Sequence, residues 1–483
     1  MNNGELRQKT LGGLIWKFAE SVGNQAVSFI VSMVLARLLL PEEYGVISIV
    51  TVFITICNVF VNSGLGTALI QKKDADPLDF STVFYTSFAI SLLLYGAMFF
   101  AAPWIAVFYK MPLLTPVIRV MSLRFVIASA NTIQRSYVSK HMQFRKLFLA
   151  TLGGTVFSGV VGVVLAIKGF GVWALVAQYL LQALAETVVL FVVVSWRPRI
   201  MFSLRRLKGL FSFGWKLLVS SLLDTLYNNL RSLIIGKKYS SADLAFYNKG
   251  KQFPELVSSN VITTIDSVLF PVIAMKQDDK PAVKQMTRRF IKSSTYIMMP
   301  LMIGLACIAE PMVRLLLTEK WLFCVPYIQI YCVVGFLQPI QTANMQAIKA
   351  MGRSDILLKL EIIKKTFGTL LLLAAMPFGV LVLAGSNILY SIVVLILNTS
   401  PNRKLMGYTL WEQIVDILPN LAIALVMGVA VYALAFLPLP DIVILVLQIA
   451  SGAAIYLLES LLFKNESFIY IKDMLVSKLK GTK

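Results

Sequence analysis

Fourteen apolar stretches, each about twenty residues or longer, cover almost the whole of this 483-residue chain. A helix needs about 20 residues to cross roughly 30 Å of hydrocarbon, so fourteen spans with short connections consume nearly the entire length. With 58% apolar and 14% charged residues, the chain is also too apolar for one soluble core. The sequence therefore predicts an all-α integral membrane protein with about 14 transmembrane helices, typical of a transporter.

The boundaries of these spans follow the apolar runs, and Pro377 and Gly379 separate the eleventh span from the twelfth. We expect spans at residues 12–37, 45–70, 80–106, 113–137, 147–168, 171–195, 209–236, 246–273, 289–317, 322–348, 356–376, 379–399, 412–436 and 440–463. The first span is not expected to be a cleaved signal peptide, because Glu20, Asn24 and Gln25 interrupt its apolar run.

Basic residues are unevenly distributed between alternate loops. With a cytoplasmic N-terminus, most of them fall on the cytoplasmic side, among them Lys72, Arg135, Arg205 and Arg403. The positive-inside rule then places both termini of this multi-pass protein in the cytoplasm. A net charge of +21 spread over many short loops reflects this topology and not nucleic-acid binding.

Two basic segments, 196–210 and 464–483, carry apolar residues at helical spacing between lysines and arginines. This pattern predicts amphipathic helices on the inner leaflet. For the first segment, a solvated linker with lipid-facing arginines is an equal alternative.

The chain contains an internal repeat with an offset of about 200 residues. Trp16-Lys17 opens the first span as Trp215-Lys216 opens the seventh, and 41–45 (PEEYG) corresponds to 241–245 (SADLA). Six spans separate the two starts, so both halves enter the membrane from the same side, as in a parallel repeat. Chance similarity of two amphipathic helices is the alternative.

The repeat predicts two pseudo-two-fold-related six-helix bundles around a central cavity, plus two C-terminal helices. The expected parts are a six-helix lobe (1–195), a cytoplasmic basic linker (196–208), a second six-helix lobe (209–399), two further spans (400–463) and a cytoplasmic tail (464–483).

Ionisable and polar side chains at mid-depth are the candidate cavity residues, because a charge in the bilayer interior costs roughly 2.5–3.5 kcal/mol on insertion scales. Helical spacing places Arg124, Asn131 and Arg135 on one face of the fourth span, and Asp224, Asn228 and Arg231 on one face of the seventh. From the repeat, we expect the polar residues of the first span to face Asp224 and Asn228 across a cleft. The candidate substrate-binding residues are Arg124, Arg231, Asp224, Asn228, Glu20, Asn24, Gln25, Arg119, Asn131, Lys249, Lys251 and Lys364.

Arginines at this depth suit an anion on an amphipathic carrier, since guanidinium binds phosphate oxygens in bidentate fashion. A neighbouring carboxylate could balance the empty site or take up a coupling proton. The structural alternative for each residue is an interhelical ion pair, or a long side chain that reaches the interface.

Signals for catalysis or a bound cofactor are missing from the sequence. His141 is the single histidine, which excludes His-based triads and metal sites, and there is no P-loop or Rossmann fingerprint. The cysteines lie within predicted spans without metal-ligand spacing, so we expect packing roles and no disulfide for Cys57, Cys307, Cys324 and Cys332. We therefore expect that the chain is not an enzyme and that it binds no cofactor.

Short motifs over roughly the first 352 residues make the chain similar to the multidrug/oligosaccharidyl-lipid/polysaccharide exporter superfamily, in its bacterial polysaccharide-transporter branch. They are 134–145 (QRSYVSKHMQFR), 169–178 (GFGVWALVAQ), 202–209 (FSLRRLKG), 245–247 (AFY), 269–271 (LFP), 300–305 (PLMIGL), 318–321 (TEKW) and 350–352 (AMG). Beyond these motifs the likeness is one of hydropathy only.

The resemblance implies a Wzx-type flippase of the bacterial cytoplasmic (inner) membrane. Such a flippase moves undecaprenyl-pyrophosphate-linked oligosaccharide repeat units from the inner to the outer leaflet for lipopolysaccharide, capsule or exopolysaccharide synthesis. It implies alternating access with proton or sodium coupling, and membrane lipids, a polysaccharide polymerase and glycosyltransferases as partners. The family defines cavity charges only loosely, so the candidate residues depend on the depth argument.

Three other functions are compatible with so apolar a chain. A multidrug exporter of the same superfamily would favour an acidic cavity, whereas arginines are at least as numerous as acids here. A flippase for a lipid-linked cell-wall precursor remains an alternative. A membrane polysaccharide polymerase is disfavoured, because it would need a larger extramembrane loop than this chain has.

Overall fold

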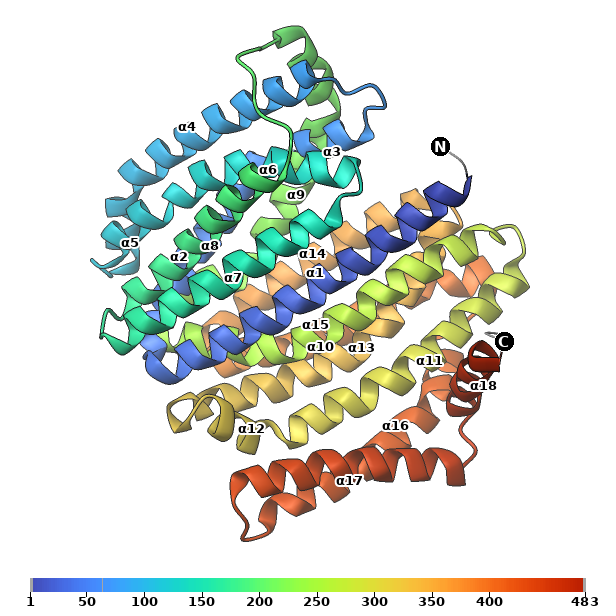
Figure 1. Cartoon of the computed structure of the whole chain (residues 1–483). Helices are drawn as coiled ribbons and strands as arrows, with labels where there is room; N and C mark the ends of the chain where they lie inside the picture. The colour runs from blue at the N-terminus through green and yellow to red at the C-terminus, as the bar shows by residue number, and fades with distance from the viewer. Residues whose placement is uncertain (1–2, 63, 481–483) are drawn as a thin grey trace. The chain divides into compact units, whose positions relative to one another are not determined.

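The computed structural model describes residues 3–62 and 64–480, with side chains from residue 12 to 476 except at positions 14, 63, 212, 213, 264, 266–268, 474 and 475. All regular elements in this part of the chain are helices (Figure 1). In lipid, every backbone N–H and C=O must bond within its own segment, which only a helix or a closed barrel achieves. The predicted all-α class is confirmed.

The helices form two compact units, residues 1–245 and 246–483. The first unit contains α1 (Asn3–Leu38), α2 (Pro41–Asn62), α3 (Leu65–Gln71), α4 (Pro77–Tyr109), α5 (Leu114–Met121), α6 (Leu123–Lys140), α7 (Phe144–Ile167), α8 (Val172–Val193) and α9 (Leu204–Lys238). The second unit takes over within α10 (Ser241–Ala274) and contains α11 (Lys280–Cys307), α12 (Ala309–Leu316), η1 (Glu319–Cys324), α13 (Val325–Ala350), α14 (Ser354–Ala375), η2 (Met376–Phe378), α15 (Val380–Met406), α16 (Leu410–Ala433), η3 (Leu434–Phe436), α17 (Asp441–Leu462) and α18 (Glu466–Lys480).

Eleven stretches of the described residues are helical, long and apolar enough to span a membrane. Three further long helices, α9, α10 and α14, coincide with predicted spans but are not among these eleven. The multi-pass membrane character is therefore confirmed, and the count of fourteen stays a prediction.

The internal repeat is visible in the turn that precedes α2 and in the turn that precedes α10. Glu43 accepts a hydrogen bond from the backbone N–H of Leu40 (2.8 Å), and Asp243 accepts one from that of Ser240 (3.1 Å). The two turns are 200 positions apart, because residues 40 and 43 correspond to residues 240 and 243. The same carboxylate-to-backbone hydrogen bond at both positions supports a structural repeat.

A second pair of turns repeats in the same way, between α6 and α7 and between α13 and α14. Backbone N–H groups of Gln143 and Arg353 donate to Val138 and Ile348, five residues back in each case (3.0 and 3.2 Å). Met142 and Gly352 both have positive φ, 56° and 72°, at the equivalent position. The division into two six-helix lobes at 195 and 209 stays a prediction, since the compact units are defined by packing and place α9 in the first unit.

The expected amphipathic helix over 196–210 is wrong in its first part. Residues 194–203 have no helix, and α9 begins at Leu204 with Ser203 as its N-cap. Pro198 disfavours a helix at the residue before it. The extended segment is held by hydrogen bonds from Arg199 N to Ser81 Oγ and from Ser203 N to Thr82 Oγ1 (both 3.2 Å). The helix predicted in the tail is present as α18.

In the first unit, α7 packs along α1 on one side and α8 on the other (Figure 1). Small buried residues line α7, including Gly154, Ser158 and Gly162. A Cβ on Gly154 would lie only 3.2 Å from the backbone oxygen of Gln182 in α8. Small residues let membrane helices approach closely, and here they bring α7 close to α8.

We predict that Gly45→Ala lowers the thermal stability of the protein. A Cβ at Gly45 would lie 1.9 Å from the backbone oxygen of Ser241, so the starts of α2 and α10 would have to separate. Overpacking of this kind costs about 1–3 kcal/mol. Gly96→Ala is the control, because a Cβ there meets nothing within 4 Å. Equal melting temperatures for the two purified variants, followed by size-exclusion chromatography after heating, would contradict the close approach.

Candidate functional site: a polar row in the first unit

A row of polar side chains follows the interface between α6 and α8. At one end the Arg124 guanidinium lies 5.6 Å from the ring centre of Tyr179. At the other end Arg135 donates to the Glu186 carboxylate, with Nε 2.5 Å from Oε1. The earlier residue of α6 contacts the earlier residue of α8, and the later one contacts the later one, so the two helices run in the same direction.

Helical spacing places these groups on facing sides of the two helices. Arg124 and Arg135 are eleven residues apart, about 16 Å along α6 at 1.5 Å per residue. On α8, Tyr179, Gln182 and Glu186 lie at i, i+3 and i+7, which is one helical face. The row therefore covers about half of the hydrocarbon thickness.

Neutral groups extend the row from α8 to α7 and α1. Thr155 Oγ1 on α7 donates to Asn24 Oδ1 on α1 (2.6 Å) and accepts from Gln182 Nε2 on α8 (3.1 Å). Thr155 is almost completely buried, at 1% exposure. Burial of a polar group costs free energy unless it is bonded, so these contacts fix the register of three helices.

Chemically, the row combines two guanidinium groups, an aromatic face, two amides and one carboxylate. Amides and arginines donate to sugar hydroxyls and phosphate oxygens, and an aromatic face suits the apolar face of a sugar ring. Arg135 is neutralised by the buried Glu186. Arg124 pairs with no carboxylate in the described part of the chain, so its positive charge is available to an anion.

Several other predicted site residues of the first unit have local partners. Glu20 is buried and accepts from Lys17 of its own helix (2.6 Å). Arg119 donates from Nε to the backbone oxygen of Phe99 (3.2 Å) and stacks on that ring. These contacts match the structural alternative, in which a charge is satisfied by its neighbours.

The remaining candidates of this unit lie on three helices. Gln25 on α1 is half-buried and Asn131 on α6 is buried. On α9, Asp224 and Asn228 are exposed and Arg231 is half-buried. Asn24 bonds to α7, and the predicted pairing of the first span with Asp224 and Asn228 stays a prediction.

The second unit holds the last three candidates, each beside a polar neighbour one turn away. Lys249 is buried and donates to Gln252 (3.2 Å). Lys251 pairs with Glu255 (3.0 Å), and the buried Lys364 pairs with Glu361 (2.5 Å).

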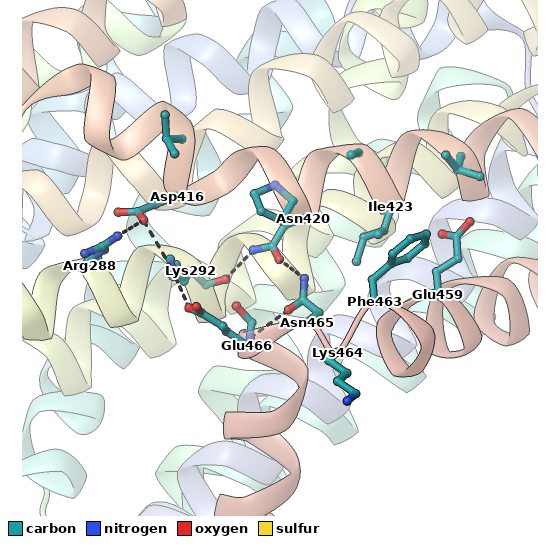
Figure 2. A pocket seen from close by; sticks show the side chains of 15 residues that line it. Arg288, Lys292, Asp416, Asn420, Ile423, Glu459, Phe463, Lys464, Asn465 and Glu466 are labelled. Carbon is teal, nitrogen blue, oxygen red and sulfur yellow. Dashed lines mark hydrogen bonds and ion pairs between the residues drawn. The ribbon is translucent and has the colours of Figure 1, made fainter.

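A second polar cluster, not predicted from the sequence, lines a cavity of about 660 Å³ in the second unit (Figure 2). The buried Asp416 of α16 accepts from Arg288 of α11 (2.5 Å) and lies 3.4 Å from the Lys292 ammonium group. Lys292 also donates to Glu466 of α18 (2.7 Å), and this contact lowers the pKa of the Glu466 carboxyl. A carboxylate in the apolar run of α16 was the signal that could have identified this cluster.

The cavity in the second unit is electrically balanced. Its lining has three cations, Arg288, Lys292 and Lys464, and three acids, Asp416, Glu459 and Glu466. Asn465, which precedes α18, donates to Asn420 of α16 (2.9 Å). These contacts hold the tail helix against α11 and α16.

Comparisons with known proteins agree with this architecture. The model of the family described as polysaccharide biosynthesis protein matches residues 34–326. The chain is 25% identical to the succinoglycan biosynthesis transport protein ExoT of Rhizobium meliloti (strain 1021) over 71% of this chain and 69% of that protein. It is 24% identical to the lipopolysaccharide biosynthesis protein WzxC of Escherichia coli (strain K12) over 77% of this chain and 76% of that one.

Among solved structures, the lipid II flippase MurJ in an inward closed conformation superposes with a TM-score of 0.74. The superposition covers 93% of this chain and 98% of that chain at 13% identity, which shows a shared fold.

We predict that Thr155→Val destabilises the protein by about 1–3 kcal/mol, because it leaves the Asn24 and Gln182 amides without their shared hydroxyl. Thr86→Val is the matched control, since the Thr86 hydroxyl donates to Thr82 O of its own helix (2.8 Å). The measurement is the midpoint of thermal unfolding in detergent. The same shift for both variants would show that the link across three helices adds nothing.

Proposed function

The chain belongs to the polysaccharide biosynthesis protein family, and from this premise we propose that it is a flippase for lipid-linked oligosaccharide repeat units. The substrate would be an oligosaccharide on undecaprenyl pyrophosphate, moved from the inner to the outer leaflet of the bacterial cytoplasmic membrane. Relatives in succinoglycan transport and lipopolysaccharide synthesis support this substrate class.

The observation that carries the proposal is the polar row from Arg124 to Glu186. A diphosphate needs a cation at depth, and Arg124 supplies one beside an aromatic ring. Sugars need hydrogen-bonding groups, and the half-buried amides of Gln182 and Asn24 supply them where α8 adjoins α7 and α1. One row thus offers both kinds of contact that a lipid-linked sugar requires.

The orientation proposed for the chain places both termini in the cytoplasm, on the basis of the positive-inside rule. Transport would proceed by alternating access, and a proton or sodium gradient would supply its energy. Glycosyltransferases would supply the substrate and a polymerase would consume it, while this chain itself would perform no chemical step.

A cell-wall-precursor flippase is the second candidate, because the superposition with MurJ spans most of both chains. A multidrug exporter is less favoured, because the row contains two arginines and only one carboxylate.

In cells that lack this protein, we predict that lipid-linked oligosaccharide accumulates on the inner leaflet and that Arg124→Ala restores transport on the order of tenfold less well than wild type. Arg231→Ala tests the second predicted arginine in the same assay. Arg403→Ala is the control, an exposed arginine at the end of α15. The measurement is the outer-leaflet fraction of the pathway's lipid-linked oligosaccharide.

Normal outer-leaflet levels without the protein would refute the flippase. Full rescue by both Arg124→Ala and Arg231→Ala would leave the function intact and remove these residues from the site.

A further inference from the structure

A cationic hollow lies in the first unit where α3 ends and α9 begins. Its volume is about 800 Å³. Its lining combines three basic side chains and one amide with two apolar side chains and one glycine. The lining residues are Ala68, Gln71, Lys72, Arg205, Arg206, Gly209 and Leu210.

Two of the three cations are held in place by carboxylates outside the hollow. Asp79, fully buried, lies 2.6 Å from the Lys72 ammonium group and 3.4 Å from Arg206. Asp76 lies 3.2 Å from Arg206 and forms a capping box with Asp79 at the start of α4. Neither carboxylate lines the hollow, so its charged wall is cationic.

The third cation has no such neutralisation. Arg205 is exposed, and no carboxylate within the described ranges forms an ion pair with it. Three cations therefore face two acids, which leaves a net positive charge at the hollow. An anion that bridges Arg205 and Lys72 would offset this net positive charge.

Exposed apolar side chains at and just before the start of α9 indicate the level of the hollow in the bilayer. Ile200 is 97% exposed and Leu204 72% exposed, with Phe202 between them. Hydrogen bonds from Arg199 and Ser203 to α4 hold this extended segment in place. Exposed apolar residues among arginines are typical of the membrane interface, where lipid phosphates lie.

We propose that this hollow binds the phosphate group of an anionic lipid, with Lys72, Arg205 and Arg206 on the phosphate oxygens and Ala68 and Leu210 beside the start of the lipid chain. Two lipids carry this chemistry: an anionic phospholipid of the surrounding leaflet and a polyprenyl diphosphate. Only the second source rests on the proposed function, and it would make the hollow a loading site for the carrier before transport.

The test uses the purified full chain in detergent and native mass spectrometry with three probes. These are phosphatidylglycerol, farnesyl diphosphate, and phosphatidylcholine as the lipid without net charge. We expect Arg205→Gln to weaken binding of at least one anionic probe roughly tenfold, the scale of one charge-assisted contact. Phosphatidylcholine binding should not change.

Two further variants separate a built site from general attraction to positive charge. Lys208→Gln removes an exposed charge from the same helix turn, outside the hollow, and should leave binding unchanged. Gly209→Leu keeps the charge but fills the hollow, since a Cβ there meets nothing within 4 Å, and should weaken binding as Arg205→Gln does.

Loss of farnesyl diphosphate alone would identify the carrier as the ligand, and loss of phosphatidylglycerol alone would identify the phospholipid. Wild-type affinity of Arg205→Gln for both anionic probes, or equal weakening by Lys208→Gln, would overturn the proposal. The transport assay is separate: normal outer-leaflet levels in cells without the protein would refute the flippase and leave a measured lipid site standing.

Discussion

A backbone amide in hydrocarbon has no water to bond, and this constraint governs the fold. It forces each crossing segment into a helix and leaves side chains to make every specific contact between helices. Association cannot rely on the hydrophobic effect, because lipid tails are as apolar as the helix surfaces. Close packing at Gly154 and the hydrogen bonds of Thr155 are two examples of what replaces it.

Buried polar groups therefore determine how the helices of each unit are positioned against one another. In the second unit, Asn344 accepts from Asn402 (2.6 Å) and exchanges hydrogen bonds with Gln413 (2.7 and 3.1 Å). These three amides join α13, α15 and α16, as Thr155 joins α1, α7 and α8 in the first unit. A hydrogen-bonded amide cluster in low dielectric favours one helix register over others.

Hydropathy was sufficient to predict the helical membrane class. The repeat was detectable because Glu43 and Asp243 make the same hydrogen bond to the backbone in equivalent turns. Depth alone identified Asn24 and Arg124 as members of the polar row. Tyr179, Gln182 and Thr155 were missed, because neutral polar residues in an apolar run also bond within their own helix and so give no distinct signal. Contacts between helices depend on their rotation about their axes, which a single sequence does not specify. The segment 194–203 is extended and not helical, because Pro198 disfavours a helix there in spite of the helical spacing of the apolar residues.

The difference between the two arginines of the row has an electrical consequence. Arg135 and Glu186 form a neutral pair, so their displacement through the membrane field requires no net work. Arg124 lies against the neutral ring of Tyr179 and keeps its whole charge. Moving one elementary charge through 100 mV takes about 2.3 kcal/mol, so in the proposed flippase the charge of Arg124 would offset one negative charge of the diphosphate during such a movement. The voltage dependence of transport would then be set by the charge that the ligand retains beyond this single arginine.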